Sequence, residues 1–548
     1  MSRHLGGLVC LGLLVAVASA QDSSKVFFLQ KNASQWADQL KNGDAAARRN
    51  AAFALGKLGK HARLALPALQ TTLKQEKDAK ACEAMVWAAG EIAGATGSDP
   101  DLQATLIAAL SHPDKLVRRS AACALGQSGA TGPAVRDALA AVLSDKEAVV
   151  RQNAAWALGQ LDEKAAPALC SALKDGDSLV KRDAANALFA VGRVKPSVMR
   201  PALGDLLKMT GDPSSEVRKA GLTPLVWIIE PKDKEAAPIL KAVLSDADPE
   251  VRRFAAQALA RVGGKDAEPA VPILVDAIRT GEAATKRSAA IALGQIGEAA
   301  GSAVPDLIKA LNDPNPQVRG GAALALGKIG KAAEDAVPAL VNILTDKQQS
   351  LEFRVEAAEA LTNMGAIPAI RERIPQMLTV LGNPNEPGDL RIRTAWLFNE
   401  FLVAEQTDAV KSGYDTFAKV CAEPSSKDNG STRYHCAWLL GIVYQREAPD
   451  PALDVLEEWL YDTTGKLYGG KVASSGVSGT EKKSQDNVDA VLEGDSRVMA
   501  VQALKFIGKG RVRDRPKIVQ QLKALAKDEK TNSELKKDAR DLLNLLGQ

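Results

Sequence analysis

Glycines at two places in the chain have the spacing of a phosphate-binding loop. Residues 291–301 read IALGQIGEAAG, and three close glycines there would leave backbone N–H groups free to cradle an anion. Residues 465–472 read GKLYGGKV, but Val472 stands where such a loop needs Ser or Thr to hold Mg²⁺, and no strand-like segment precedes it. The first stretch recurs 33 residues later as LALGKIG, whereas a phosphate loop occurs once. We therefore interpret neither stretch as a nucleotide site.

Metal and nucleophilic chemistry have few candidate residues. Outside the leader described below, the histidines are His61, His112 and His435, which lie far apart and lack the spacing of metal ligands. His435 directly precedes Cys436, so on a helix the two side chains would point in different directions. No nucleophile and base can be assembled from spacing. The sequence predicts a non-enzymatic protein with no metal and no cofactor.

The first twenty residues have the pattern of a secretory signal peptide. Residues 1–4 form a positive start, residues 5–17 form an apolar run too short to span a membrane, and ASA before Gln21 resembles a signal-peptidase site. No later segment is long and apolar enough for a membrane span. We expect an exported protein, periplasmic or extracellular.

Composition and charge limit the kind of partner. Only 4% of the residues are aromatic although 46% are apolar, so the core must be built from Ala, Leu, Val and Ile. The 70 basic and 66 acidic residues give a net charge of +4, too small by itself to indicate a nucleic-acid partner. We expect a monomer that binds a protein or other macromolecule and no specific nucleic acid.

Five cysteines follow the leader: Cys82, Cys123, Cys170, Cys421 and Cys436. An odd and sparse set in a long exported chain is not a disulfide scaffold. Cys421 and Cys436 could be bridged across two helices joined by a turn, and two separate buried thiols fit the spacing at least as well.

A thirteen-residue unit, V-R-x-x-A-A-x-A-L-G-x-I-G, recurs along the chain. Its fourteen copies begin at residues 47, 81, 117, 150, 180, 217, 251, 285, 318, 353, 390, 432, 496 and 535. Apolar residues at unit positions 1, 5, 8, 9 and 12 lie on one face of a helix. Glycine at position 10 favours close helix approach, and glycine at position 13 favours a left-handed helix end.

A second helical pattern, often with an early proline, precedes most units, as in residues 303–311 and 336–344. Neither helix of such a pair can bury its apolar face alone, so neighbouring pairs must stack. The prediction is an all-α fold, an α-solenoid of about fourteen helix pairs. We divide the chain into a signal peptide (1–20), a regular array (21–389) and divergent repeats (390–548) with a Gly/Ser-rich loop insertion at about 463–487.

The unit, its proline-bearing partner helix and the aspartate-containing turn between them resemble HEAT repeats, of the subtype first described in phycobilisome bilin lyases. The resemblance covers nearly the whole chain after the leader and implies a scaffold with a partner-binding surface. Deoxyhypusine hydroxylase, a HEAT-repeat enzyme, binds iron through His-Glu pairs, and no such pair occurs here. The resemblance also implies a ladder between the position-2 arginines and turn aspartates such as Asp145, Asp246 and Asp313. Those arginines are Arg118, Arg151, Arg218, Arg252, Arg319, Arg354 and Arg497.

Two unit positions carry candidate binding residues. Position 7 holds an aromatic ring in five repeats, at Phe53, Trp87, Trp156, Trp396 and Trp438. Position 3 holds a basic residue in others, including Arg49, Arg119, Arg182, Arg253 and Arg287. By resemblance the second helices line the concave face of a solenoid, where rings and arginines form interface hot spots. Rings buried by crowded neighbouring ridges, and a solvated charged face, are the alternatives.

The function that these observations favour is an exported, non-catalytic scaffold that binds a macromolecular partner along its concave face. Two other functions fit the sequence. One is a lyase or oxidoreductase-like enzyme related to the bilin lyases or to deoxyhypusine hydroxylase. The other is a structural spacer in an envelope or extracellular assembly.

Overall fold

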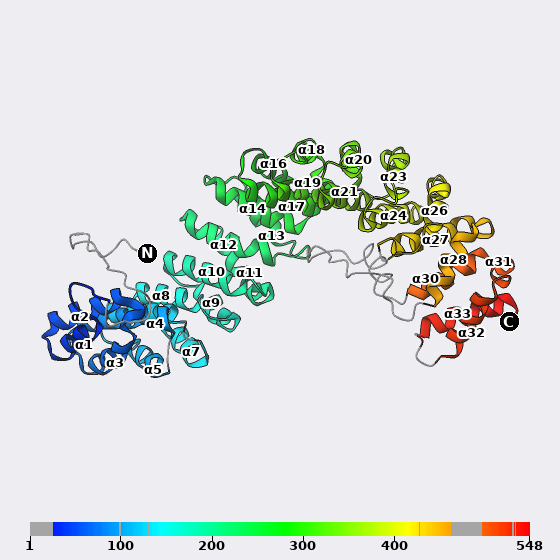
Figure 1. Ribbon diagram of the computed structural model, residues 1–548. Coiled ribbons are helices and arrows are strands. Elements are labelled where there is room, and N and C mark those ends of the chain that lie inside the picture. The colour runs from blue at the N-terminus through cyan, green and yellow to red at the C-terminus, as the bar shows by residue number, and fades with distance from the viewer. Residues whose placement is uncertain are drawn as a thin grey trace. The chain divides into compact units, whose positions relative to one another are not determined.

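The computed structural model describes residues 26–97, 100–129, 131–426, 428–461, 496–528, 531 and 533–548. These residues form helices and turns, and none of them forms a strand (Figure 1). They divide into two compact units, unit 1 up to Val262 and unit 2 from Gly263 onward. The predicted signal peptide and the 463–487 insertion, with the 465–472 stretch, lie outside the described residues.

Every copy of the thirteen-residue unit lies in a helix, which we name a repeat helix. In unit 1 the repeat helices are α2 (Ala45–Leu58), α4 (Ala79–Thr96), α6 (Lys115–Gln127), α8 (Ala148–Leu158), α10 (Ser178–Gly192), α12 (Ser215–Ile228) and α14 (Pro249–Val262). In unit 2 they are α17 (Ala283–Ile296), α19 (Pro316–Ile329), α21 (Leu351–Met364), α24 (Gly388–Val403), α27 (Gly430–Tyr444), α30 (Ser496–Ile507) and α33 (Ser533–Leu546). The predicted α-solenoid of helix pairs is confirmed.

Partner helices alternate with the repeat helices. In unit 1 they are α1 (Ala33–Asn42), α3 (Leu66–Gln75), α5 (Pro100–Ala109), α7 (Pro133–Val142), α9 (Ala166–Ala172), α11 (Leu203–Met209) and α13 (Ala236–Val243). In unit 2 they are α15 (Gly264–Ala267), α16 (Val271–Thr280), α18 (Val304–Ala310), α20 (Val337–Thr345), α22 (Pro368–Arg371), α23 (Ile374–Leu381), α25 (Thr407–Lys411), α26 (Tyr414–Cys421), α28 (Asp450–Leu460), α31 (Lys509–Arg513) and α32 (Pro516–Lys527).

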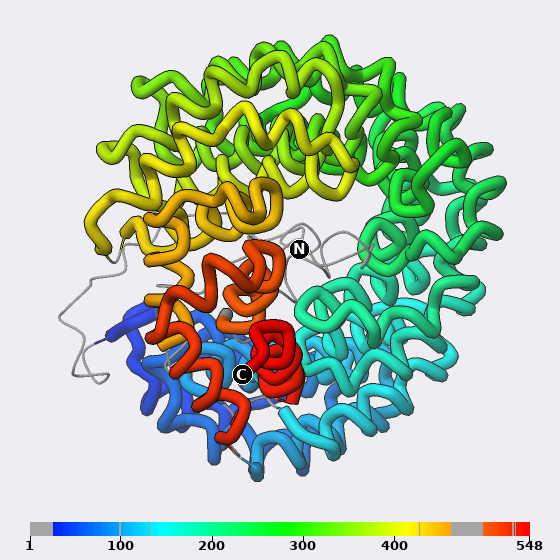
Figure 2. Tube along the Cα trace, turned by 90° about the vertical axis from the view of Figure 1, so that its right-hand side faces the viewer, coloured from blue at the N-terminus to red at the C-terminus, as the bar shows by residue number. Residues whose placement is uncertain are grey.

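Short 3₁₀ helices join some of these elements: η2 (Gly59–Ala65), η3 (Glu163–Ala165), η4 (Pro196–Ala202), η5 (Glu268–Ala270), η6 (Gly297–Ala303), η7 (Gly330–Ala336) and η8 (Gln445–Glu447). Within each unit every repeat helix packs against the next one in the sequence. Figure 2 shows this stacking in chain order, with neighbours in colour lying side by side.

Side chains and glycines set where the repeat helices begin and end. Asp44 and Asp114 accept backbone N–H groups of the first turns of α2 and α6, both at 2.7 Å. Gly297 and Gly330, at position 13, end α17 and α19 with φ of 74° and 69°. Their ψ angles of −142° and −133° differ from the predicted left-handed helical stop and belong to a region open to glycine alone. Among the glycines at position 13, Gly192 alone does not have a positive φ.

The core of each pair is built from the predicted apolar positions. In α19 these are Val318, Ala322, Ala325, Leu326 and Ile329, and each is at most 1% exposed. Small alanines between leucines let the helices lie close, which suits a core with few aromatic residues.

Where position 10 is glycine, the helix backbone closely approaches the alanine at position 8 of the next unit. A Cβ on Gly90 would lie 2.8 Å from the Cα of Ala124, and a Cβ on Gly294 would lie 3.0 Å from the Cα of Ala325. The first distance is shorter than real Cβ contacts and the second is tighter than most of them, so the backbones meet with little or no room for a side chain. The predicted role of this glycine in close helix approach is confirmed.

Position 2 carries an arginine or lysine that ties one repeat to the next. Arg118 in α6 binds Asp145 through two bonds, Nε–Oδ2 at 2.6 Å and Nη2–Oδ1 at 2.9 Å. Its Nη1 donates to the carbonyl oxygens of His112 and Pro113, at 2.9 and 2.8 Å. The carbonyl oxygen of Asp145 accepts from Arg151 of the next repeat at 2.8 Å. The turn containing Asp145 is thus held by the arginines of two successive repeats.

The same pairing recurs along both units. The further ion pairs are Arg48–Glu76, Arg151–Asp175, Lys181–Asp212, Arg218–Asp246, Lys286–Asp313, Arg354–Glu386, Arg391–Glu423 and Arg433–Glu458. The predicted ladder is confirmed, with the carboxylate supplied by the turn that follows the arginine rather than by the turn before it. Arg252 and Arg319 donate to the carbonyl oxygens of the preceding turn and form no carboxylate pair within the described residues.

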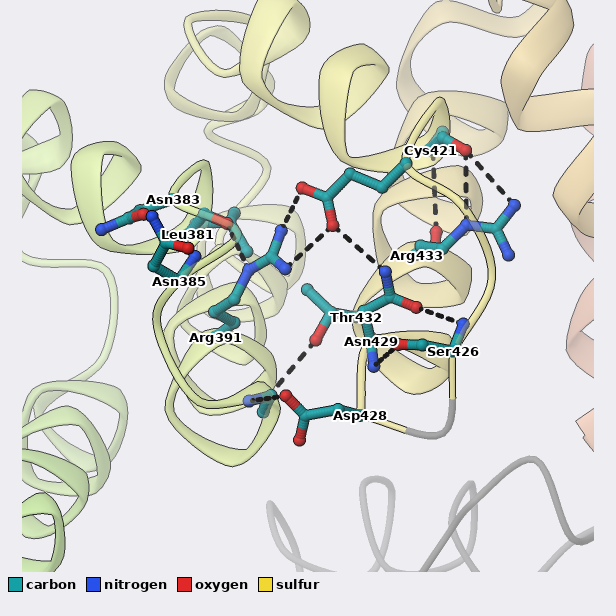
Figure 3. Close-up of polar contacts among 12 residues, drawn as sticks. Leu381, Asn383, Asn385, Arg391, Cys421, Ser426, Asp428, Asn429, Thr432 and Arg433 are labelled. Carbon is teal, nitrogen blue, oxygen red and sulfur yellow. Dashed lines mark hydrogen bonds and ion pairs between the residues drawn. The ribbon is translucent and has the colours of Figure 1, made fainter.

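Arg391 in α24 shows how completely such a charge is satisfied (Figure 3). Its side chain is 2% exposed, its Nε donates to the carbonyl oxygen of Leu381 at 2.8 Å, and its two Nη atoms bind Glu423 at 2.9 and 2.6 Å. Asn429 donates from Nδ2 to the same carboxylate at 3.2 Å. A buried charge is tolerated only when it is paired in this way.

Substitution of Gly90 by alanine tests the close helix contact. The added Cβ would collide with the backbone of Ala124, so we expect Gly90→Ala to lower the free energy of unfolding by about 1–3 kcal/mol. Gly204→Ala is the matched control, because nothing lies within 4 Å of its Cβ position. The control should be neutral or stabilising by up to about 1 kcal/mol. Equal urea midpoints for the two variants would contradict the contact.

Substitution of Arg118 by glutamine tests the ladder. Because it leaves the nearly buried Asp145 carboxylate without its cation, we expect a loss of about 3 kcal/mol in the free energy of unfolding. The exposed pair of Arg136 and Asp137 provides the control, and Arg136→Gln should cost about 0.5 kcal/mol or less. The measurement is urea unfolding followed by circular dichroism, and similar losses in both variants would count against the ladder.

Candidate binding surface

One face of the repeat helices, which carries unit positions 3, 7 and 11, points away from the core of the helix pair; we name it the 3-7-11 face. Positions spaced by four residues form one stripe along a helix. In α2 the three positions are Arg49, Phe53 and Lys57, and all three side chains are exposed. Because the apolar side chains at positions 5, 8, 9 and 12 are used in the core, the stripe of positions 3, 7 and 11 is the part of the helix that a partner can reach.

The five aromatic residues predicted at position 7 all lie on the 3-7-11 face. Phe53 is 40% exposed, whereas the four tryptophans are half-buried. They are Trp87, Trp156, Trp396 and Trp438.

Two of the tryptophan rings rest on the preceding repeat. A Cβ on Gly56 would lie 2.4 Å from Cζ3 of Trp87, and a Cβ on Gly126 would lie 2.7 Å from Cζ3 of Trp156. The position-10 glycine of one repeat therefore accommodates the position-7 ring of the next. One part of each ring is used for packing between repeats, and the remainder stays accessible to solvent.

Phe53 and Trp87 form a stacked pair across the first two repeats. Their ring centroids are 5.4 Å apart and their planes differ by 21°. The ammonium group of Lys57 lies 5.4 Å from the Phe53 centroid and 5.5 Å from the Trp87 centroid, a cation–π arrangement. An aromatic platform capped by a cation therefore occupies this end of the 3-7-11 face in unit 1.

The basic residues predicted at position 3 do not form one free positive stripe. Arg119 binds Glu83 at 2.6 Å, Arg182 binds Asp183 at 2.7 Å and Arg253 binds Glu250 at 2.6 Å. Arg49 and Arg287 are exposed and form no ion pair within the described residues. Most of the positive charge at position 3 is thus neutralised inside the chain.

Other aromatic residues on the same surface escaped the sequence analysis, which considered position 7 alone. Phe189 and Trp227, at positions 10 and 11, lie with ring centroids 6.0 Å apart, and Trp227 is 48% exposed. Phe254, at position 4, lies under the guanidinium of Arg253 at 4.5 Å, and Phe506, at position 11, is 51% exposed. Positions 4, 7, 10 and 11 share one side of a helix, so the 3.6-residue period could have found them.

In unit 2 the tryptophans have charged and polar neighbours. Arg393 forms an ion pair with Glu359, and its guanidinium lies 5.6 Å from the centroid of Trp396. His435 lies 5.5 Å from Trp438 and is hydrogen-bonded through Nε2 to Oδ1 of Asn399 at 3.0 Å. Burial lowers the pKa of His435 to about 4, which keeps the imidazole neutral at physiological pH.

Acidic residues gather in an open groove between α28 and α32. Asp454, Glu457 and Glu458 line it together with Tyr461, Lys517 and Gln520. Asp454 pairs with Arg515, and Glu458 pairs with Arg433 at 3.0 Å, so these two carboxylates serve the structure. Within the described residues no group of three or more His, Cys, Asp or Glu side chains could hold a metal ion.

The five cysteines within the described residues are free thiols. Cys421 and Cys436, for which a bridge was conceivable, are both buried and unbridged. Burial raises the pKa of Cys421 to about 12 and that of Cys436 well above its usual value, which disfavours the reactive thiolate.

A family model for HEAT repeats matches residues 86–158, 103–189, 137–222, 201–293, 271–362 and 304–388, together more than half of the chain. The chain belongs to the HEAT-repeat family. No helix in the described part of the chain has the length and apolar character needed to cross a bilayer.

Solved structures with similar folds include a homology model of the AP-3 complex, with a TM-score of 0.54 and 13% identity over 94% of this chain and 93% of that chain. Importin beta aligns with a TM-score of 0.41 and 17% identity over 94% of this chain and 73% of that chain. Kap121p aligns with a TM-score of 0.38 and 16% identity over 90% of this chain and 56% of that chain. No curated protein sequence matches the chain. At these identities the similarity shows the fold alone.

The low pKa of His435 predicts a loss of stability in acid. The unfolded chain binds a proton near pH 6.5, whereas the folded chain resists protonation down to about pH 4, so stability falls as the pH drops through this window. The loss should reach about 2–3 kcal/mol at pH 4. His435→Gln should remove this part of the pH dependence, although it also costs packing at pH 7. The measurement is urea unfolding at pH 7 and pH 4.5 followed by tryptophan emission, and an unchanged pH dependence in the variant would contradict it.

Proposed function

We propose that the chain is an exported, non-catalytic scaffold that binds a protein partner along the 3-7-11 face of its repeat helices. The observation that carries this proposal is the placement of the rings. In a chain with only 4% aromatic residues, rings recur on the 3-7-11 face, which points away from the core of the helix pairs. Partly exposed aromatic residues beside arginine and lysine are the usual anchors of protein interfaces.

Export is part of this proposal and is supported by the first twenty residues, with their positive start, apolar run and cleavage-like ASA sequence. We place the mature protein in the periplasm or outside the cell. We also assign the repeats to the subtype of the bilin lyases, on the strength of the unit sequence alone.

A protein partner is favoured over nucleic acid because the chain neutralises most of its own position-3 arginines. Arg119, Arg182 and Arg253 each bind a carboxylate of the same chain. A nucleic-acid surface would instead present a continuous track of free cations to the phosphates. The protein acts as a monomer in this proposal.

The test is capture of partners from the matching envelope or secreted fraction with the full chain immobilised through a C-terminal tag. Phe53→Ser combined with Trp227→Ser removes two exposed rings from the 3-7-11 face. We expect captured partners to fall at least about tenfold, as for loss of interface hot spots.

Leu64→Ser is the matched control, because Leu64 is 85% exposed and lies in η2, away from the 3-7-11 face. Its capture profile should equal that of the wild type, and all variants should keep the wild-type melting temperature. Capture that is insensitive to the double substitution would refute the proposed face. If the wild type captures nothing, the structural spacer is the better description.

A further inference from the structure

Two basic side chains on the first repeat helix have no carboxylate partner among the described residues. Arg49 and Lys57, at positions 3 and 11 of α2, are exposed and form no ion pair with any described residue. At position 3 elsewhere in unit 1, Arg119, Arg182 and Arg253 are each held by a carboxylate, whereas Arg261, at position 11 of α14, donates to the carbonyl oxygen of Ile229. The first repeat therefore presents two free cations on the 3-7-11 face.

The acidic residues of the second repeat that could neutralise Arg49 and Lys57 bind the third repeat instead. Glu83, at position 3 of α4, binds Arg119 of the third repeat at 2.6 Å. Glu91, at position 11 of α4, accepts a hydrogen bond from Gln127 of the third repeat at 3.4 Å. Both carboxylates of the second repeat thus engage the third repeat, which leaves Arg49 and Lys57 available.

An aromatic surface lies between the two cations. Phe53, at position 7, is midway between Arg49 and Lys57 on α2 and is 40% exposed. It is stacked on Trp87, and the Lys57 ammonium lies over both rings, which restrains that cation at the edge of the surface. We name the set of Arg49, Phe53, Lys57 and Trp87 the N-terminal platform.

We propose that the N-terminal platform binds an extended peptide segment of a partner with the pattern acidic-x-aromatic-x-acidic. The inference rests on the proposed function and adds the chemistry of the segment that is recognised. Each carboxylate would pair with one cation, and the central ring would lie against Phe53 and Trp87.

The spacing of the platform fits an extended chain. Arg49 and Lys57 are eight residues apart on a helix, a rise of about 12 Å. In an extended segment, residues i and i+4 are about 13 Å apart. Residues i, i+2 and i+4 also project from the same face, so both carboxylates and the ring meet the platform together. A helical segment would need acidic residues eight positions apart for the same span.

The charge on the platform favours a short acidic peptide over a polyanion. The next position-3 arginines, Arg119 and Arg182, already have carboxylate partners, so the unpaired position-3 cation of the first repeat is not continued in the repeats that carry them. A nucleic acid would have to break those pairs to gain further contacts.

The experiment uses the full chain and a fluorescein-labelled peptide, Gly-Asp-Ser-Phe-Ser-Asp-Gly, followed by fluorescence anisotropy at low salt. Binding should weaken about threefold in Arg49→Gln or Lys57→Gln and about tenfold in the double variant. Lys74→Gln removes the same charge from an exposed site on α3 and should bind like the wild type. Replacing both Asp residues of the peptide by Asn should have the same effect as the double variant.

Three results would overturn the proposal: no binding of the peptide to the wild type, equal binding of the Asn peptide, or an equal loss in Lys74→Gln. Displacement of the peptide by an oligothymidylate at equal charge concentration would assign the platform to polyanions and likewise overturn it. The partner capture described above can succeed while the peptide fails to bind. That combination would refute the acidic motif and leave the scaffold function standing.

Discussion

The contact between a glycine of one repeat helix and an alanine of the next sets the spacing on which the other features depend. At Gly90 and Ala124 the backbones approach so closely that a single added carbon would collide. This proximity lets Trp87 and Trp156 reach back over the glycine of the preceding repeat, and it lets position-2 arginines reach the following turn. A larger residue in place of Gly90 would force these two helices apart, whereas the repeats that carry Phe189 or Thr362 at position 10 keep their ladder pairs without this close contact.

The ladder connects each repeat to the one that follows it in the chain. An arginine of the ladder binds carbonyl oxygens of the turn before it and, except at Arg252 and Arg319, a carboxylate of the turn after it, as Arg118 does with Pro113 and Asp145. The charges are nearly buried, so each pair is strong only while the geometry is kept. Register between repeats is therefore held by polar contacts, whereas the cohesion comes from the apolar core.

A partner can bind on the 3-7-11 face, which neither the apolar core nor the ladder uses. The core takes positions 1, 5, 8, 9 and 12, and the ladder takes position 2, so positions 3, 7 and 11 remain. On this face the chain uses some residues to satisfy one another, such as Arg119 with Glu83, and leaves others free, such as Arg49 and Lys57. A partner can gain new interactions at these free residues, and not along all of positions 3, 7 and 11.

The sequence by itself determined the solenoid, because a thirteen-residue unit with one apolar helical face recurs along the chain, and such faces can be buried only when neighbouring helix pairs stack. It also determined the role of the position-10 glycines and the existence of a ladder at position 2, because both features are local and repeated. Only the tertiary structure decided which carboxylate each arginine binds, that Phe53 is more exposed than the position-7 tryptophans, and that Arg49 and Lys57 lack carboxylate partners. It also placed the division into compact units after Val262, inside the array predicted to be regular, whereas the boundary at residue 389 stays a prediction. The physical reason is that exposure and pairing depend on the neighbouring repeat, about thirty residues away in the chain. A periodic pattern describes all repeats alike, whereas the side chains of each neighbouring repeat are different.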